Sequence, residues 1–542
     1  MKIPNKFNPS LFGLIIIYLI TRLYNLLILP IFTDESIYIY WAKIIATTHS
    51  HWFISLTDGK PPLLVWMTAI FLKIFPSQWY LLAGRLPSVI AGTLTLIGIY
   101  KISKILFKSE KVAIIASVLY ILNPFSLLYD RMALFDSLLT SMLLWTVYFA
   151  IKTATTRSLK DAFLWGLFLG LAYLSKPTAG IFLLLTPICF LLSYQGKWKN
   201  NWKQLIVLIG VPLFIGECIN NLQRLSHVYY LMSAKNQQFQ QPIDKLLKNP
   251  FELTLGNLHG FFSWLIPYYT GPIFIVGLIA FIILLRKKLK ECIILFLLWF
   301  APIFILATVG REIFPRYILF TTPYFLIAIA YLINWVWIFS LTNHTVESSR
   351  GGMFFEQAHR VLSPDGVVGV SLGRTQKNMP TSANGWNKTS QFIVRILLTL
   401  VILIPSIRFD YLLLTNPPAS PLPDSDYHQY ISEHPSGYGL DKIFYYLNVE
   451  LQNGPLTLIT QGTFGLYPYA FNLEYWDNKN LTIIPRWPLS TIDQEILDRA
   501  KSEKIYILLK EYDQIPANLP LHLILRAKKP GGKYPILLTT LK

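Results

Sequence analysis

Two adjacent carboxylates, Asp34 and Glu35, directly follow the first apolar run of the chain. A carboxylate at a membrane boundary can act as general base for an acceptor hydroxyl, or it can bind a cation. The pair can equally belong to a helix start, because Thr33 and Asp34 are good N-cap residue types and acids are favoured in a first helical turn. Taken alone, the spacing leaves both interpretations open.

A lysine before a proline pair forms the second motif, DGKPP at residues 58–62. Proline is tolerated in the first turn of a helix, so Lys60 is expected at the start of an interfacial helix. A cation fixed there can hold a phosphate group. The alternative is a lysine whose charged end reaches the membrane surface while its stem stays among apolar groups.

Asp130, Arg131 and Asp136 lie between two apolar runs. Charges that flank a membrane helix often mark its boundary. Asp136, however, lies inside the next helical run, where an ionisable group costs free energy and usually serves a function.

Later segments add Lys176 in LSKPTAG, and Arg316 with Tyr317 in REIFPRY. On the expected topology, all these charged groups converge on one membrane face. A site that handles a lipid phosphate needs cations to offset the charge of the leaving phosphate and a carboxylate to take a proton.

The elements that position these groups are apolar helices. Hydrophobic residues make up 53% of the 542 residues and charged residues only 14%, and the mean hydropathy is +0.44. This composition predicts a polytopic α-helical membrane protein with about 11–13 transmembrane helices. Apolar runs of spanning or nearly spanning length occur at residues 11–31, 83–107, 112–129, 132–151, 161–175, 178–194, 205–221, 271–285, 291–309, 316–339 and 391–413, with 61–76 and 254–269 as further candidates.

The basic residues predict the orientation. The net charge of +19 comes from short clusters between apolar runs, which argues against nucleic acid as a partner and for the positive-inside rule. With a cytoplasmic N-terminus, the basic loops fall inside and the acids named above fall outside. We therefore expect a membrane module at 1–340 with a first external loop at 32–82, a cytoplasmic polar loop at 341–390, a last membrane helix at 391–414, and a small extracytoplasmic α/β domain at 415–542.

The order of the motifs resembles the bacterial glycosyltransferase family 39, which is similar to protein O-mannosyltransferases and to the aminoarabinose transferase of lipid A. The matching series is DE, GKPPL, RLPS, R-x4-D, a KP pair and RY, over roughly residues 10–340. The resemblance implies a GT-C enzyme of the bacterial cytoplasmic (inner) membrane. Such an enzyme takes a sugar from a polyprenyl-phosphate carrier, inverts its anomeric centre, and delivers it to a lipid, glycan or protein acceptor on the outer face.

Carried over by position, the resemblance implies three catalytic residues: Asp34 as the general base, Glu35 beside it, and Asp136 as the second external carboxylate, which helps to organise the site. It assigns the remaining positions to the carrier phosphate and its cavity: Lys60, Lys176 and Arg316 as cations, Arg131 as a weaker match, and Tyr317 in the cavity wall.

The chain departs from the pattern at Gly59, where aminoarabinose transferases commonly carry a glutamate of a metal site. A divalent metal is therefore doubtful for this chain, although His259 is a candidate ligand. His49 and His51 have ligand-like spacing but lie in a polar loop.

Two other classes of function remain as alternatives. A transporter or flippase of lipid-linked sugars predicts internal repeats, with Gly/Pro-broken helices at matching positions in two halves. The sequence shows no such symmetry, and its charges lie at one membrane boundary instead of the bilayer middle. A membrane-anchored binding or assembly protein would act through residues 415–542 and leaves the charges on the outer face unexplained.

Overall fold

The apolar runs form helices in the computed structural model, which describes residues 8–196, 201–353 and 388–542. The helices of the membrane module are α1 (Pro9–Leu23), α2 (Thr33–Thr48), α3 (Leu63–Ile74), α4 (Tyr80–Phe107), α5 (Glu110–Ile121), α6 (Pro124–Tyr129), α7 (Phe135–Thr156), α8 (Leu159–Tyr173), α9 (Ile181–Ser193), α10 (Trp202–Asn220), α11 (Tyr229–Phe239), α12 (Ile243–Lys248), α13 (Thr254–Tyr269), α14 (Gly271–Lys287), α15 (Leu289–Val309), α16 (Thr322–Met353) and α17 (Lys388–Thr415).

Helix ends differ from the expected bounds where local polar groups intervene. The run at 112–129 is two helices, because the Asn123 side chain accepts a hydrogen bond from the Ser126 amide at 3.1 Å and starts α6 at a proline. The run at 11–31 is helical only to Leu23, and Asn25 then adopts a left-handed conformation with φ of 51°.

Membrane-spanning potential is clear for part of the bundle. Among the residues that the structure describes, five helical stretches are each long and apolar enough to cross a bilayer: Ser77–Phe107, Phe135–Thr156, Trp202–Leu225, Leu289–Val309 and Pro315–Trp337. Helices α13 and α14 pass the same test together, with a bend of 108° between them. Three shorter apolar helices accompany them, so the expected total of 11–13 spans stays a prediction.

The C-terminal residues form a five-stranded sheet with the order β2-β1-β3-β5-β4. Its strands are β1 (Leu456–Gln461), β2 (Leu481–Arg486), β3 (Lys504–Leu509), β4 (Leu521–Ala527) and β5 (Ile536–Leu541). Strands β2 and β3 pair in parallel with β1, whereas β5 pairs antiparallel with β3 and β4. Helices α19 (Leu440–Leu451), α20 (Leu466–Glu474) and α21 (Gln494–Arg499) complete the expected small α/β domain.

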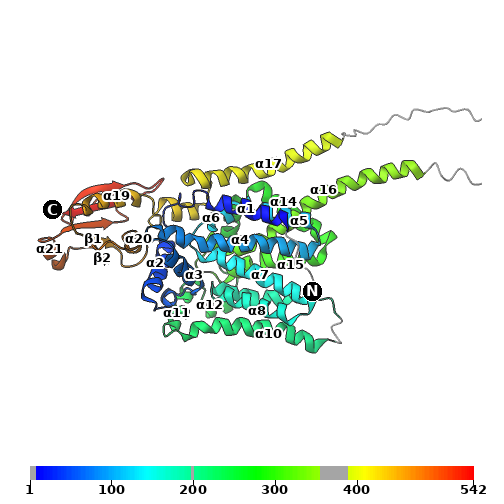
Figure 1. Ribbon diagram of the computed structural model, residues 1–542, viewed down its shortest axis with the longest axis horizontal. Helices are drawn as coiled ribbons and strands as arrows, with labels where there is room; N and C mark the ends of the chain where they lie inside the picture. The colour runs from blue at the N-terminus through cyan, green and yellow to red at the C-terminus, as the bar shows by residue number, and fades with distance from the viewer. Residues whose placement is uncertain (1–7, 197–200, 354–387) are drawn as a thin grey trace, which may run out of the picture.

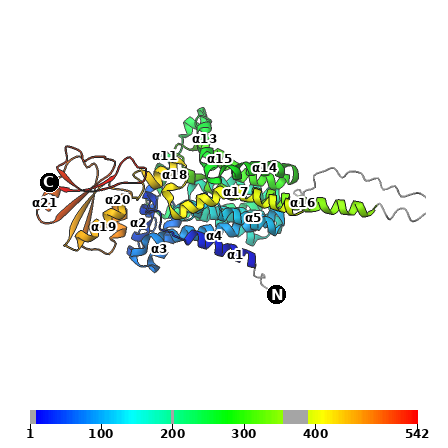
Figure 2. The ribbon, with the colours of Figure 1, turned by 90° about the horizontal axis from the view of Figure 1, so that it is seen from above.

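The sheet domain lies at one end of the helical bundle, next to α2 and α3 (Figure 1). Helix α2 contacts α20, where Tyr40 stacks on Tyr469 at 4.5 Å between ring centroids and the Lys43 ammonium donates to the Asn472 carbonyl at 2.7 Å. Helices α16 and α17 extend from the opposite end (Figure 2).

The expected polar loop at 341–390 is described only in part. Helix α16 continues to Met353, so residues 341–353 of the expected loop belong to this helix. Residues 354–387 of that loop lie outside the described residues.

Candidate active site

The first turn of α2 separates the two adjacent carboxylates. Successive residues in an α-helix point about 100° apart, so Asp34 and Glu35 face different neighbours. Asp34 lines a cavity of about 900 Å³ that partly opens to solvent, whereas Glu35 does not line it.

Glu35 is fully buried and accepts hydrogen bonds from two other segments and from the N-cap residue of its own helix. Arg85 of α4 donates to both of its carboxylate oxygens at 2.8 Å, and the Ala133 amide donates to Oε1 at 2.7 Å. The Phe32 amide donates to Oε2 at 3.1 Å. Glu35 therefore joins the start of α2 to α4 and to the loop before α7. Both acids lie in the first turn of α2, as the helix-start interpretation expects, but the N-cap is Phe32 and not Thr33 or Asp34.

Asp34 forms an ion pair with Arg316, whose Nη2 lies 3.0 Å from Asp34 Oδ2. Its side chain is 25% exposed and that of Arg316 is 9% exposed. The other terminal nitrogen of Arg316 donates to Gln429 Oε1 at 2.7 Å and to Tyr430 Oη at 3.1 Å. The guanidinium is thus held in one orientation, with one arm toward the cavity carboxylate.

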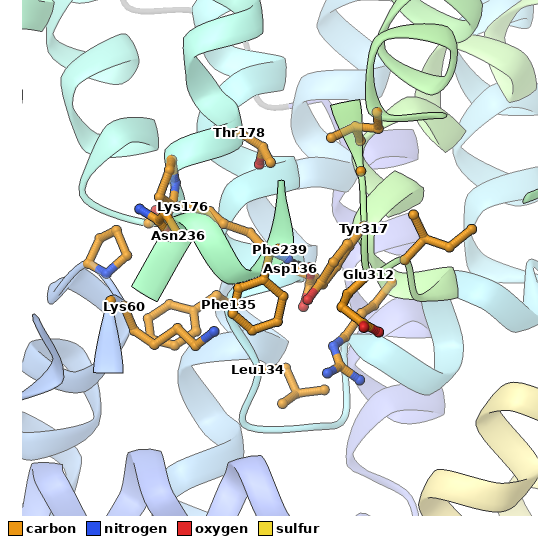
Figure 3. Close-up of a pocket in the computed structure, with 18 of the residues that line it drawn as sticks. Lys60, Leu134, Phe135, Asp136, Lys176, Thr178, Asn236, Phe239, Glu312 and Tyr317 are labelled. Carbon is orange, nitrogen blue, oxygen red and sulfur yellow. Dashed lines mark hydrogen bonds and ion pairs between the residues drawn. The ribbon is translucent and has the colours of Figure 1, made fainter. Parts of the chain in front are cut away.

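Asp136 and Lys176 form the second ion pair of the cavity, with 2.7 Å between Lys176 Nζ and Asp136 Oδ1. The ammonium also lies 3.9 Å from the ring centroid of Tyr317, within range of a cation–π interaction. Burial lowers the pKa of Lys176 to about 8, against the opposing effect of Asp136. Figure 3 shows these three side chains around the cavity.

Lys60 enters the same cavity without a carboxylate partner among the described residues. Its ammonium lies 4.9 Å from the ring centroid of Phe239 in α11. Among the cavity cations it is thus the one that forms no ion pair with a described carboxylate.

The residue before Lys60 explains how α11 comes so close. Gly59 has a φ of +71°, and a Cβ atom at this position would lie 2.7 Å from Lys235 Cβ. A larger side chain here would be strained in its backbone and would displace α11. The family's glutamate therefore does not fit at this position in this fold.

The far wall of the cavity comes from a segment that the sequence did not single out. Asn236, Phe239 and Gln240 line it, and a short antiparallel bridge pairs Gln240 with Gly310. Glu312 lines the same side. The sequence offered only a coarse signal, namely a long polar stretch between the apolar runs at 205–221 and 254–269.

Two of the predicted site residues lie elsewhere. Arg131 donates to the main-chain oxygens of Tyr24 and Asn25 at 3.0 and 2.6 Å and does not line the cavity. His259 is exposed on α13. Within residues 8–196, 201–353 and 388–542, no group of three His, Cys, Asp or Glu side chains is placed to hold a metal ion.

The structure thus brings together six predicted residues from distant segments: Asp34, Lys60, Asp136, Lys176, Arg316 and Tyr317. It leaves Glu35, Arg131 and His259 outside the cavity wall.

Residues 59–219 match the sequence model of the dolichyl-phosphate-mannose-protein mannosyltransferase family. The fold is similar to crystal structures of ArnT from Cupriavidus metallidurans. The apo structure aligns with a TM-score of 0.54 and a sequence identity of 13% to this chain. The structure bound to undecaprenyl phosphate aligns with a TM-score of 0.52 and a sequence identity of 12%. Both alignments cover 98% of this chain and 97% of the other. No curated protein sequence matches the chain significantly.

The resemblance drawn from the motifs is therefore confirmed. The chain has the GT-C fold of ArnT, with a small C-terminal sheet domain, and residues 59–219 carry the sequence pattern of the mannosyltransferase family.

Proposed function

We propose that the protein is a membrane glycosyltransferase that moves a sugar from a polyprenyl-phosphate carrier to an acceptor hydroxyl. The observation that carries this proposal is the single cavity lined by three carboxylates and three cations from five segments. The fold supports it, since one of the similar ArnT structures is bound to undecaprenyl phosphate.

The charges of the cavity assign a role to each group. Two cations are paired with carboxylates at 2.7 and 3.0 Å, whereas Lys60 forms no ion pair with a described carboxylate. Its ammonium is therefore available to pair with a carrier phosphate. Lys60 is therefore the principal phosphate-binding group, and Lys176 and Arg316 add to the positive field around it.

The proposed reaction is a direct displacement at the anomeric carbon. The acceptor oxygen forms a bond to this carbon as the bond to the carrier phosphate oxygen breaks, and the phosphate leaves on its lipid. Asp34 takes the proton of the acceptor hydroxyl. Because the acceptor attacks the face opposite to the leaving phosphate, the anomeric configuration inverts.

Asp34 is suited to this role by its contacts. Arg316 occupies Oδ2, and no described residue donates a hydrogen bond to Oδ1, which leaves this oxygen for the acceptor. The base must be held within hydrogen-bond reach of the proton that it removes, and the ion pair fixes its side chain.

The orientation in the membrane is part of the proposal. The cavity lies at the end of the bundle that carries the sheet domain. Basic residues lie at the ends of α4 and α7 remote from it: Lys104 is in the last turn of α4, and Lys108 and Arg157 directly follow the two helices. The positive-inside rule then puts the cavity on the extracytoplasmic face of the bacterial inner membrane.

The test is a transfer assay in nanodiscs. Purified protein is incubated with radiolabelled polyprenyl-phosphate sugars and a membrane extract, with the wild type beside Asp34→Asn. We expect transfer from one donor that the variant loses. Uptake of a lipid-linked sugar into vesicles without transfer would favour the transporter alternative. Transfer by Asp34→Asn at the wild-type rate would refute the assignment of the base.

A further inference from the structure

The segment after the last membrane helix returns to the cavity before it enters the sheet domain. It comprises residues 424–437, with α18 (Asp424–Tyr427) and the turn His428–Ser432 at its start. Two sets of contacts connect this segment to the Asp34–Arg316 ion pair, one through main-chain atoms and one through side chains.

The main-chain contacts hold the residue beside Asp34. The Pro435 carbonyl accepts hydrogen bonds from the amide and the hydroxyl of Thr33 at 3.0 and 2.9 Å. A Cβ atom on Gly437 would lie 2.2 Å from the Ile31 carbonyl oxygen, so only glycine permits this approach. The start of α2 is thus pinned by the segment 424–437.

The sheet domain in turn holds this segment. Lys529, which follows β4, donates to the main-chain oxygens of Glu433 and Ser436 at 2.8 and 2.7 Å. The Ser436 hydroxyl donates to the Tyr430 carbonyl at 2.9 Å.

The side-chain contacts hold Arg316. Gln429 and Tyr430 both accept from Arg316 Nη1, and Nη2 remains directed at Asp34. Tyr430 also packs edge-on against Phe32, with 4.8 Å between ring centroids. Both partners of the ion pair therefore have neighbours in the segment 424–437.

A buried carboxylate orients the Tyr430 hydroxyl. Tyr430 donates to Tyr129 Oη at 3.3 Å, and Tyr129 donates to Asp426 Oδ2 at 2.5 Å. Tyr268 donates to the same oxygen. Burial raises the pKa of Asp426 to about 6, and the two phenol hydrogen bonds oppose this effect. Because Tyr430 donates its hydroxyl proton to Tyr129, a lone pair on the same oxygen accepts the hydrogen bond from Arg316.

We propose that Gln429 and Tyr430 are positioning residues, which hold the Arg316 guanidinium so that Asp34 keeps the orientation needed to accept a proton. This inference rests on the proposed function of Asp34. It gives the C-terminal segment a direct part in the geometry of the site.

The first experiment is a double-mutant cycle on transfer kinetics with Tyr430→Phe and Arg316→Lys. Loss of a hydrogen bond to a charged group predicts a fall in kcat of roughly tenfold for Tyr430→Phe. Lys60 remains in place, so the KM for the donor should change by less than about threefold. In the Arg316→Lys background, Tyr430→Phe should lower kcat much less, because the hydrogen bond between residue 316 and Tyr430 is already absent. Equal effects in both backgrounds would overturn the proposal.

Tyr475→Phe is the matched control. Tyr475 is also a buried tyrosine of the C-terminal domain, and its hydroxyl donates to the Phe444 carbonyl at 3.2 Å, away from the cavity. We expect Tyr475→Phe to keep the wild-type kcat, and we expect Tyr430→Phe and Tyr475→Phe to have similar thermal stability. A tenfold fall in the control would mean that any buried phenol of this domain acts through the fold alone.

A second measurement does not depend on activity. Hydrogen–deuterium exchange of the full chain in nanodiscs should become faster near residues 33–36 and 314–318 in Tyr430→Phe, but not in Tyr475→Phe. Unchanged protection at these amides would refute the positioning role. If wild type transfers no sugar and the exchange responds as expected, the proposed function fails while the coupling stands.

Discussion

Glu35 is the residue for which the sequence and the structure lead to the most distinct predictions. The sequence resemblance puts it beside the base, while the structure buries it against Arg85. The perturbation is Glu35→Gln, which keeps the shape of the side chain and removes its charge. The amide oxygen can replace only one carboxylate oxygen, and the amide nitrogen would face donors from Arg85 and a main-chain amide.

The expected cost follows from these contacts. Breaking a buried ion pair by removing one partner costs about 3–5 kcal/mol, because the remaining charge stays buried without compensation. The upper part of this range is the better expectation, since the amide of either Ala133 or Phe32 also loses its acceptor.

The assay has two parts. The free energy of unfolding is measured by denaturant titration in mixed micelles, and transfer activity is measured per folded molecule at a low temperature. We expect a large loss of stability, with activity that follows the folded fraction. Glu110→Gln is the control: this glutamate pairs with Lys104 at 3.0 Å on the surface, and little change is expected.

The result that would refute this reasoning is a Glu35→Gln protein as stable as wild type but inactive. Glu35 would then act in the chemistry, as the resemblance implies, and its contacts with Arg85 would be incidental to stability.

Three further predictions concern the cavity. Lys60→Ala should raise the KM for the donor by roughly 10–100-fold with a smaller change in kcat, because a charge-assisted contact to phosphate is lost. Lys60→Arg should keep most of the affinity, because it retains the charge. Steady-state kinetics of the two variants test both expectations. The pKa of Lys176 is lowered to about 8, so its ammonium exists below this pH and is lost as pH rises through it. Activity should therefore fall above about pH 8, and Lys176→Arg should move this fall to higher pH; a pH profile identical in the two proteins would contradict this. Gly59→Ala should lower activity and stability because its φ is +71° and the added Cβ would meet Lys235 at 2.7 Å; Gly13→Ala, which meets no atom within 4 Å, is the control.

The helices were predictable because apolar runs of this length have few other stable forms in a bilayer. The residues at which the helices begin and end were less predictable, since they depend on single polar groups. Asn123 splits one expected span, and Asn25 follows a first helix that ends earlier than its apolar run. Strands β1 and β3 are rich in β-branched residues, which favour strands.

The cavity was predictable in its charges but not in its walls. Asp34, Lys60 and Lys176 were found because ionisable groups beside apolar runs are costly and stand out. The separation of Asp34 from Glu35 follows from helix geometry, once the helix is known to begin at Thr33. Phe239 and Tyr430 were missed because their contacts join segments that no local pattern relates.

The hydrogen bond between Thr33 and Pro435 also has a consequence for biosynthesis. The two residues are 402 positions apart, so the ribosome makes one long before the other. At about 5–20 residues per second, the interval is roughly 20–80 s. During this time the membrane helices can insert and pack, but the start of α2 lacks its final partner. The contacts at the start of α2 are therefore completed as a late step, only after Pro435 has been translated.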